Sequence, residues 1–221
     1  MVMNRIFSLL ILLLLSFDSY SQCLGLQTGA YPAMGGLTPA PTIVNGVPTY
    51  PANTQVTVCY TLQSFIQFGT NWLEGFDINL GPGWNPASIT PINPPGNCGG
   101  NGSGGQWLWM NSVTSSATGL TVGPGWFFEA NQGGPVDGNP GNDWGDQGTN
   151  CVWNFCFQIT TNNSCLPNQN LYIAVTAAGD GNWGSYIPFG GQFCGTTPYV
   201  MLPNTAVINN LLPSLGSINH N

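Results

Sequence analysis

The segment DGNPGNDWGD, residues 137–146, gathers oxygen-bearing side chains into one loop. Gly, Pro and Trp separate them, and Gly and Pro favour turns over helix or strand. Hard oxygen ligands in a flexible loop are what Ca²⁺ selects. The spacing therefore predicts a calcium site. Its candidate ligands are Asp137, Asn139, Asp143 and Asp146, with Asn142 or Glu129 to complete the shell.

This loop does not match the calcium loop of an EF-hand. Gly141 stands where an oxygen ligand belongs, Asn142 replaces the glycine of the sixth position, and Gly148 replaces the bidentate glutamate. The alternative interpretation is that Asn, Asp and Gly build hydrogen-bonded surface turns without a metal. What supports a cation is the charge balance of the chain.

That balance is one-sided. The sequence has one Lys or Arg, which is Arg5, and eight Asp or Glu; Arg5 and Asp18 lie in the expected leader, so seven acids remain and no Lys or Arg. Each remaining carboxylate must be solvated, hydrogen-bonded, protonated or bound to a cation. Nucleic acid and anionic membrane surfaces are excluded as partners, since both are bound through Lys and Arg.

Residues 1–21 predict a secretory signal peptide. Asn4 and Arg5 precede an apolar run over residues 6–15, and Ser19-Tyr20-Ser21 favours cleavage before Gln22. The run is about half the length that a membrane span requires, so we expect no membrane insertion, with an uncleaved anchor as the alternative. The seven cysteines indicate an oxidising, extracellular compartment, and their odd number leaves at least one thiol unpaired or shared with another molecule.

Short runs of β-branched and aromatic residues, bounded by Gly, Pro, Asn or Ser, predict the strands that must position these side chains. The runs are 55–62, 72–80, 106–112, 119–123, 126–130, 151–160, 170–177 and 198–202. They predict an all-β fold, a single β-sandwich of jelly-roll or Greek-key type with long Gly/Pro/Asn-rich loops. We expect a lead-in over 22–39, the sandwich over 40–205 with an edge strand around 42–47, and a tail over 206–221 that forms a last strand or frays.

Alternation along two of these strands predicts a disulfide. In residues 55–62, Cys59 lies on the polar face opposite Val58 and Tyr60, and in residues 151–160 Cys156 lies among polar neighbours. A bridge between Cys59 and Cys156 follows if the two strands are neighbours; the alternative is two free surface thiols. Cys165 and Cys194 flank the run 170–177 and are our second expected pair.

Eight tryptophans suggest two different uses. Trp72, Trp107, Trp109 and Trp153 lie in predicted strands, and we expect them in the core. Four others lie in or beside Gly-rich turns, where they either stack on sugar rings or close the ends of the sandwich. These four are Trp84, Trp126, Trp144 and Trp183.

Catalytic residues are scarce. The single histidine, His220, lies beside the C-terminal residue, which argues against Ser–His or Cys–His chemistry. Glycoside hydrolysis needs only two carboxylates, so Glu74, Asp77 and Glu129 keep a glycoside hydrolase as a remote alternative. We expect a protein that is not an enzyme.

The order VTVCYTL, NWLEG, GPGW, GPGWFFE, DGNPGNDWGD and NFCFQIT resembles an uncharacterised extracellular β module of secreted and surface proteins of the Bacteroidota. The similarity spans roughly residues 45–180, and in such proteins immunoglobulin-like repeats and a sorting domain often follow. The resemblance implies a secreted, non-enzymatic adhesion or surface-associated structural module. Its expected partner is an extracellular glycan or a surface protein, and a carbohydrate-binding module is the alternative.

Overall fold

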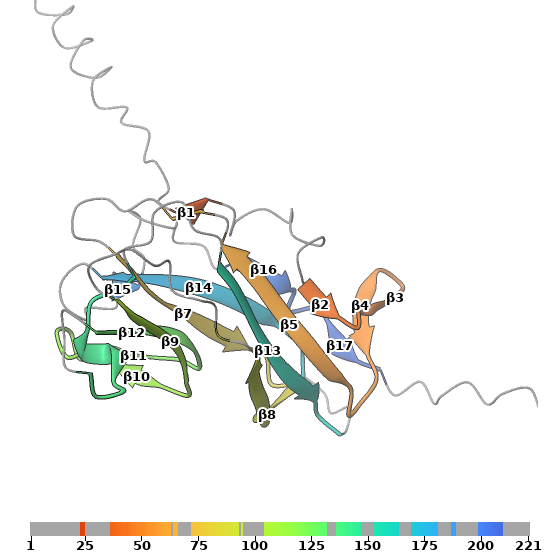
Figure 1. Cartoon of the computed structure of the whole chain (residues 1–221). Helices are drawn as coiled ribbons and strands as arrows, with labels where there is room; N and C mark the ends of the chain where they lie inside the picture. The colour runs from red at the N-terminus through yellow and green to blue at the C-terminus, as the bar shows by residue number, and fades with distance from the viewer. Residues whose placement is uncertain are drawn as a thin grey trace, which may run out of the picture.

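The chain adopts an all-β fold in this computed structural model (Figure 1). The structure describes residues 23–24, 36–62, 64–65, 72–92, 94, 104–131, 136–146, 153–163, 169–180, 187–188 and 199–209. Within these ranges the only helical element is a short 3₁₀ turn, η1 (Pro140–Asn142). No helix in the described part of the chain is long and apolar enough for a membrane crossing.

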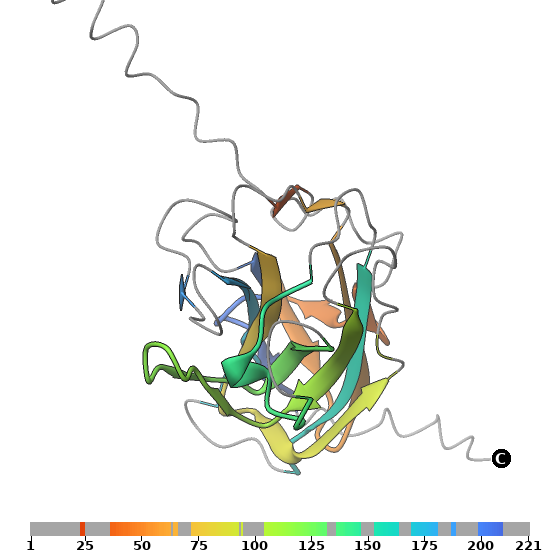
Figure 2. The same ribbon diagram turned by 60° about the vertical axis from the view of Figure 1, so that its left-hand side comes forward.

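Two facing sheets form the predicted β-sandwich. The four-stranded sheet has the order β2 (Gly36–Thr38), β5 (Gln55–Leu62), β13 (Trp153–Thr161) and β8 (Trp84–Ile92). The six-stranded sheet has the order β15 (Ile187–Pro188), β14 (Ile173–Asp180), β7 (Trp72–Leu80), β12 (Gly125–Ala130) and β9 (Gly105–Met110), and β16 (Tyr199–Leu202) also pairs with β14. In Figure 2, teal β13 and yellow β8 lie on one side and blue β14 on the other.

Smaller ladders complete the fold. A three-stranded sheet joins β3 (Thr42–Val44), β4 (Val47–Tyr50) and β17 (Val207–Ile208), with β17 parallel to β4. Two short pairs are β10 (Val113–Thr114) with β11 (Thr121–Val122), and β1 (Cys23–Leu24) with β6 (Ser64–Phe65). Strand β2 belongs to the four-stranded sheet although it lies just before the predicted range 40–205, and β17, just after that range, belongs to the three-stranded sheet.

The edge strand expected around residues 42–47 is β3, at the edge of the three-stranded sheet, and it is shorter than expected because it is one half of a hairpin. Residues 42–50 form a hairpin whose turn is Asn45-Gly46, with φ of 50° and 80°. Positive φ at both central residues is typical of a type I′ turn, and Asn-Gly is its preferred sequence. Of the two alternatives for the tail, residues 207–208 form a strand, because Val207 and Ile208 pair with Thr49 and Tyr50.

The core lies between the two sheets. Val56, Val58, Tyr60 and Leu62 of β5 are at most 2 % exposed, which confirms the predicted alternation. From β13, Trp153, Phe155, Phe157 and Ile159 reach the same layer. The Phe155 ring contacts Phe76 at 4.5 Å and Trp107 at 4.9 Å between centroids, so aromatic side chains join the two sheets.

The sequence did not indicate strand β8. Pro86 and Pro91 lie inside it, and proline lacks the N–H that a central strand needs. Within the described residues β8 pairs with β13 alone, so it is an edge strand, where proline is tolerated.

Candidate functional site

The acidic loop, residues 136–146, is held by hydrogen bonds that its own side chains form with loop backbone and with each other. Asp137 Oδ1 accepts from Asn139 N at 2.9 Å, and Asp137 Oδ2 accepts from Asn142 Nδ2 at 3.1 Å. Asn139 Oδ1 caps η1 by accepting from Gly141 N at 3.3 Å. These side chains form the turns that Asx residues favour, so part of the predicted ligand set shapes the loop.

Glu129 joins this loop to the six-stranded sheet. It lies in β12 and is 1 % exposed. Its Oε1 accepts from Asp137 N at 2.9 Å and from Gly138 N at 2.7 Å. One carboxylate oxygen therefore binds two successive backbone N–H groups and fixes the start of the loop.

Asp143 binds the sheet from the loop side. It is 0 % exposed, and its Oδ2 accepts from Ala130 N at 3.1 Å. Burial raises the pKa of Asp143 to about 7; the Ala130 N–H lowers this pKa, whereas contact with the Glu129 carboxyl and the charge of Asp137 raise it. Glu129 and Asp143 thus form a buried carboxyl pair. Glu129, in β12, accepts from backbone N–H groups of the loop, and Asp143, in the loop, accepts from a backbone N–H of β12.

The other predicted ligand, Asp146, is held at a different place. Its N–H donates to Leu73 O at 2.7 Å and its carbonyl accepts from Leu73 N at 3.1 Å, which ties the end of the loop to β7. Its side chain is 1 % exposed. Within the described ranges, no three His, Cys, Asp or Glu side chains come together as a metal-binding group. The loop brings together Glu129, Asp137, Asn139, Asn142 and Asp143.

The prediction of an exposed, sugar-stacking ring is wrong for two of the four candidate tryptophans, because their rings are buried. Trp84 is 1 % exposed and lies 6.1 Å from the Tyr50 ring, and Trp126 is 2 % exposed and lies edge-on to Trp109 at 5.6 Å. Both side chains point into the sandwich, as the alternative of closing its ends requires. Trp144 is half-buried and contacts Trp72 edge-on at 4.9 Å. Trp183 lies outside the described residues.

The predicted disulfide lies in the middle of the four-stranded sheet. Cys59 of β5 and Cys156 of β13 stand directly opposite each other, bonded with a Cα–Cα separation of 4.2 Å. On either side of it, Thr61 Oγ1 donates to Asn154 Oδ1 at 3.1 Å and Gln158 Nε2 donates to Thr57 Oγ1 at 3.3 Å. Three successive cross-strand pairs are therefore joined through their side chains. Cys165 and Cys194 lie outside the described residues.

These pairs belong to a surface that we call the outer face, the side of the four-stranded sheet that points away from the core. The sheet register places uncharged residues there from every strand. They are Gly36, Thr38, Gln55, Thr57, Cys59, Asn85, Thr90, Ile92, Asn154, Cys156, Gln158 and Thr160; Thr61 lies on the same side of the sheet but is 1 % exposed. Several of them lie on the polar face that strand alternation predicts, whereas the residues of β8 join this face only in the folded sheet.

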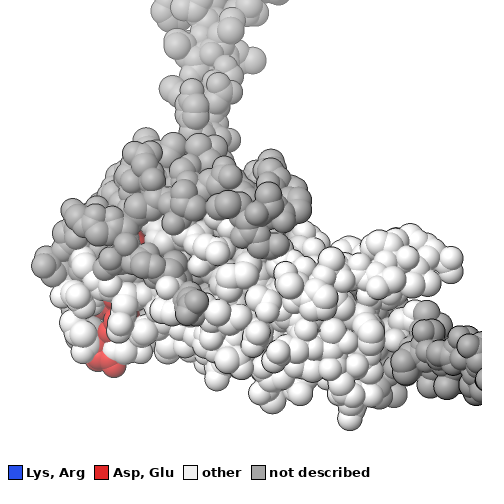
Figure 3. Space-filling model, turned by 45° about the vertical axis from the view of Figure 1, so that its right-hand side comes forward, with Lys and Arg blue, Asp and Glu red and all other residues white. Residues whose placement is uncertain are grey.

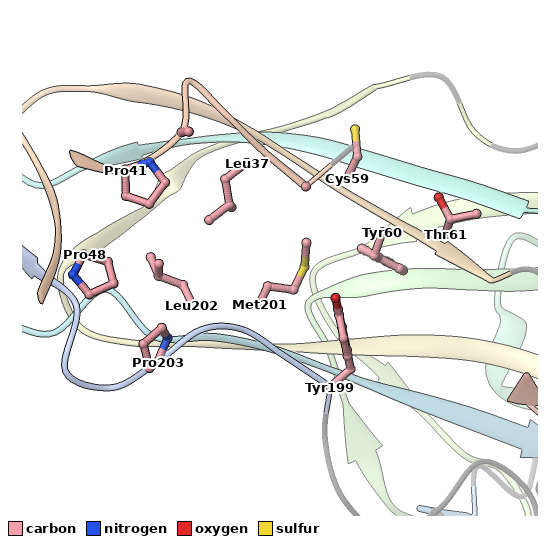
Figure 4. A pocket seen from close by; sticks show the side chains of 12 residues that line it. Leu37, Pro41, Pro48, Cys59, Tyr60, Thr61, Tyr199, Met201, Leu202 and Pro203 are labelled. Atoms are coloured by element: carbon pink, nitrogen blue, oxygen red, sulfur yellow. The ribbon is translucent and has the colours of Figure 1, made fainter. Parts of the chain in front are cut away.

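A cavity of about 430 Å³ opens between β2 and β5 on one side and β16 on the other (Figure 4). Leu37, Pro41, Met201 and Leu202 point into it, and Tyr199 stands at one end. The Cys59 sulfur points away from this space, toward the outer face. The lining is mostly apolar and has no charged side chain.

The acids considered for glycoside hydrolysis do not share one open site. Glu74 and Glu129 are at most 1 % exposed. Asp77 is half-buried, and its Oδ1 accepts from Gly123 N at 2.7 Å. The Glu129 carboxyl is in direct contact with that of Asp143, with no gap between the two for a sugar.

Comparison with known proteins finds no family model, no curated protein and no solved structure that matches this chain.

Proposed function

We propose that this chain is a secreted, non-enzymatic module of the cell surface or extracellular matrix, and that it adheres through the outer face of its four-stranded sheet. The single observation that carries the proposal is the composition of this face. Four strands contribute neighbouring hydroxyl, amide and disulfide side chains to it, and none contributes an Asp, Glu, Lys or Arg.

A surface of this kind binds through hydrogen bonds and shape rather than through charge. Side chains that are already paired, such as the hydrogen-bonded Thr57 and Gln158 and the disulfide-bonded Cys59 and Cys156, have fewer rotamers to lose when a partner binds. On the face seen in Figure 3 the acidic side chains colour a small part of the described surface, and Lys or Arg colours none of it. An adhesive contact on the outer face therefore involves no charged side chain of that face.

Salt dependence tests this proposal. The mature chain, immobilised on a sensor surface, should capture an extracellular matrix fraction or intact cells. The amount bound should change by less than about twofold between about 50 mM and about 500 mM NaCl, because screening acts on charged contacts. A steep fall in binding with salt would contradict adhesion through an uncharged face.

A charge placed on the outer face should strongly reduce capture of cells or matrix. Thr90 is exposed in β8 beside Gln158, so Thr90→Lys adds a cation without opening the core. We expect a fall of about tenfold or more, because a desolvated unpaired charge is unfavourable at an interface. Thr90→Gln controls for size, and Ile43→Lys, at a 61 % exposed position of β3, controls for added charge elsewhere. Equal losses in Thr90→Lys and Ile43→Lys would contradict the assignment of the face.

A neutral glycan is the second candidate partner, favoured by the amide and hydroxyl groups of the exposed residues Asn154 and Thr90. A glycan array separates this candidate from protein adhesion. Glycan binding on the outer face should disappear in Thr90→Lys and persist in Trp144→Ala. The reverse result would move the sugar site to the half-buried pair Trp72 and Trp144.

A further inference from the structure

Two buried carboxyl groups, those of Glu129 and Asp143, meet at the base of the acidic loop. Each uses one oxygen to accept backbone N–H groups. The other oxygens, Glu129 Oε2 and Asp143 Oδ1, are buried and have no hydrogen-bond donor. A buried acceptor without a donor is unfavourable, and more so when it carries charge. A positive species bound at these two oxygens would remove that unfavourable contribution.

A third oxygen in the same loop has the same property. Asn142 Nδ2 donates to Asp137 Oδ2, and Asn142 Oδ1 is buried without a donor. No Lys or Arg follows Arg5 in the sequence, so no ammonium or guanidinium group of the sandwich can neutralise these atoms.

We propose that Glu129 Oε2, Asp143 Oδ1 and Asn142 Oδ1 bind one calcium ion, with carbonyl or water oxygens in its remaining positions. Two carboxylates balance the charge of the ion, and all three ligands are the hard oxygens that calcium prefers. This ligand set is narrower than the one that the sequence predicts. Asp137 and Asn139 have the role of positioning residues, because their carboxylate and amide oxygens already hold the loop.

The chemistry favours calcium over other metals. Zinc and copper prefer the nitrogen and sulfur of His and Cys, which are absent from residues 129–146. Magnesium requires a near-octahedral set of short bonds, whereas calcium accepts a loop with irregular geometry. The proposal is independent of the outer face, since it concerns stability of the opposite sheet.

Thermal unfolding of the full mature chain tests the site, with calcium alone as the probe. Calcium at about 100 times its dissociation constant should raise Tm by about 5 °C over the same protein in EDTA. Native mass spectrometry should show one calcium per chain. Magnesium at the same concentration should produce a much smaller rise.

The variants Asp143→Asn and Glu129→Gln keep an oxygen for the backbone N–H bonds but remove the charge. Each should lose the calcium-dependent rise, and the acid outside the loop, Asp77→Asn, should keep it. Asn142 is half-buried, so we expect Asn142→Ala to disturb folding less than a change at the buried Glu129 or Asp143. This variant should weaken calcium binding about tenfold.

Three results would overturn the proposal. They are identical melts in calcium and EDTA, no calcium in the native mass spectrum, or a full calcium response in Asp143→Asn. The first two would leave the carboxyl pair as two groups that share a proton.

Discussion

Asp77 shows how a single acid is accommodated beside the core. Burial raises its pKa above the ordinary 3.8, and the N–H of Gly123 lowers it in part. A raised pKa in the folded chain means that the folded state binds the proton more tightly than the unfolded state. The resulting stabilisation is full below the unfolded pKa and is lost as pH rises through the folded pKa.

The variant Asp77→Asn should therefore be more stable than wild type at pH 7. Its amide oxygen can still accept from Gly123 N, and it has no charge to desolvate. The difference should shrink toward about pH 3, where Asp77 is protonated. Urea unfolding at both pH values measures this, and an Asn variant that is less stable at pH 7 would contradict the sign.

Gly75 is required for the packing of one aromatic ring. It stands opposite Phe127 across β7 and β12, and a Cβ at Gly75 would overlap the Phe127 ring. We expect Gly75→Ala to lower the free energy of unfolding by about 1–3 kcal/mol through overpacking. Combining it with Phe127→Leu, which removes the ring, should give less than the sum of the single losses. Additive losses in this double-mutant cycle would refute the contact.

At the scale of elements, the disulfide joins β5 to β13 across a sequence separation of 97 residues. The double variant Cys59→Ala/Cys156→Ala should lose about 2–4 kcal/mol of unfolding free energy, because its unfolded chain is no longer closed into a loop. Urea unfolding measures the loss, and wild type unfolded in reductant should match the variant. Equal stability of oxidised wild type and the variant would contradict a stabilising bridge.

Alternation and turn residues were enough to predict the long strands. The bounds of β5 and β7 match the predicted runs, and along β5 the apolar side chains of Val56, Val58 and Tyr60 face one layer. The same alternation placed Cys59 and Cys156 on one face. Strand β8 was not predicted, because its two prolines are more typical of a loop. The hairpin at Asn45-Gly46 was not predicted either, although this dipeptide is a known turn signal.

The candidate site was predictable only in part. The composition of residues 137–146 indicated a polar loop, but the partners of its carboxylates depend on tertiary contacts. Glu129 and Ala130 meet the loop because β12 ends beside it, and no local pattern encodes that contact. Trp84 and Trp126 are each the last residue of a GPGW sequence. Their burial nevertheless depends on which face of the sheet each strand presents to the core.

At the scale of the whole molecule, β17 closes the fold by lying parallel to β4. Ile208 is 2 % exposed, whereas Val207 is 39 % exposed, so a substitution at Val207 is the exposed control for a substitution at the buried Ile208. We expect Ile208→Ala to lower the free energy of unfolding by about 2–4 kcal/mol and Val207→Ala by less than about 1 kcal/mol. Thermal melts of both variants test this, and equal effects would mean that β17 adds no core.

The two edge-on indole pairs have an optical consequence. Trp72 and Trp144 lie 4.9 Å apart and join β7 to the acidic loop, whereas Trp109 and Trp126 lie 5.6 Å apart and join β9 to β12. Indoles at such short range couple their electronic transitions and give exciton bands in circular dichroism. One pair reports detachment of the loop and the other reports separation of strands inside the sheet. Removing Trp144 would erase the first band alone, so the native chain carries two spectroscopic labels that distinguish local opening from global unfolding.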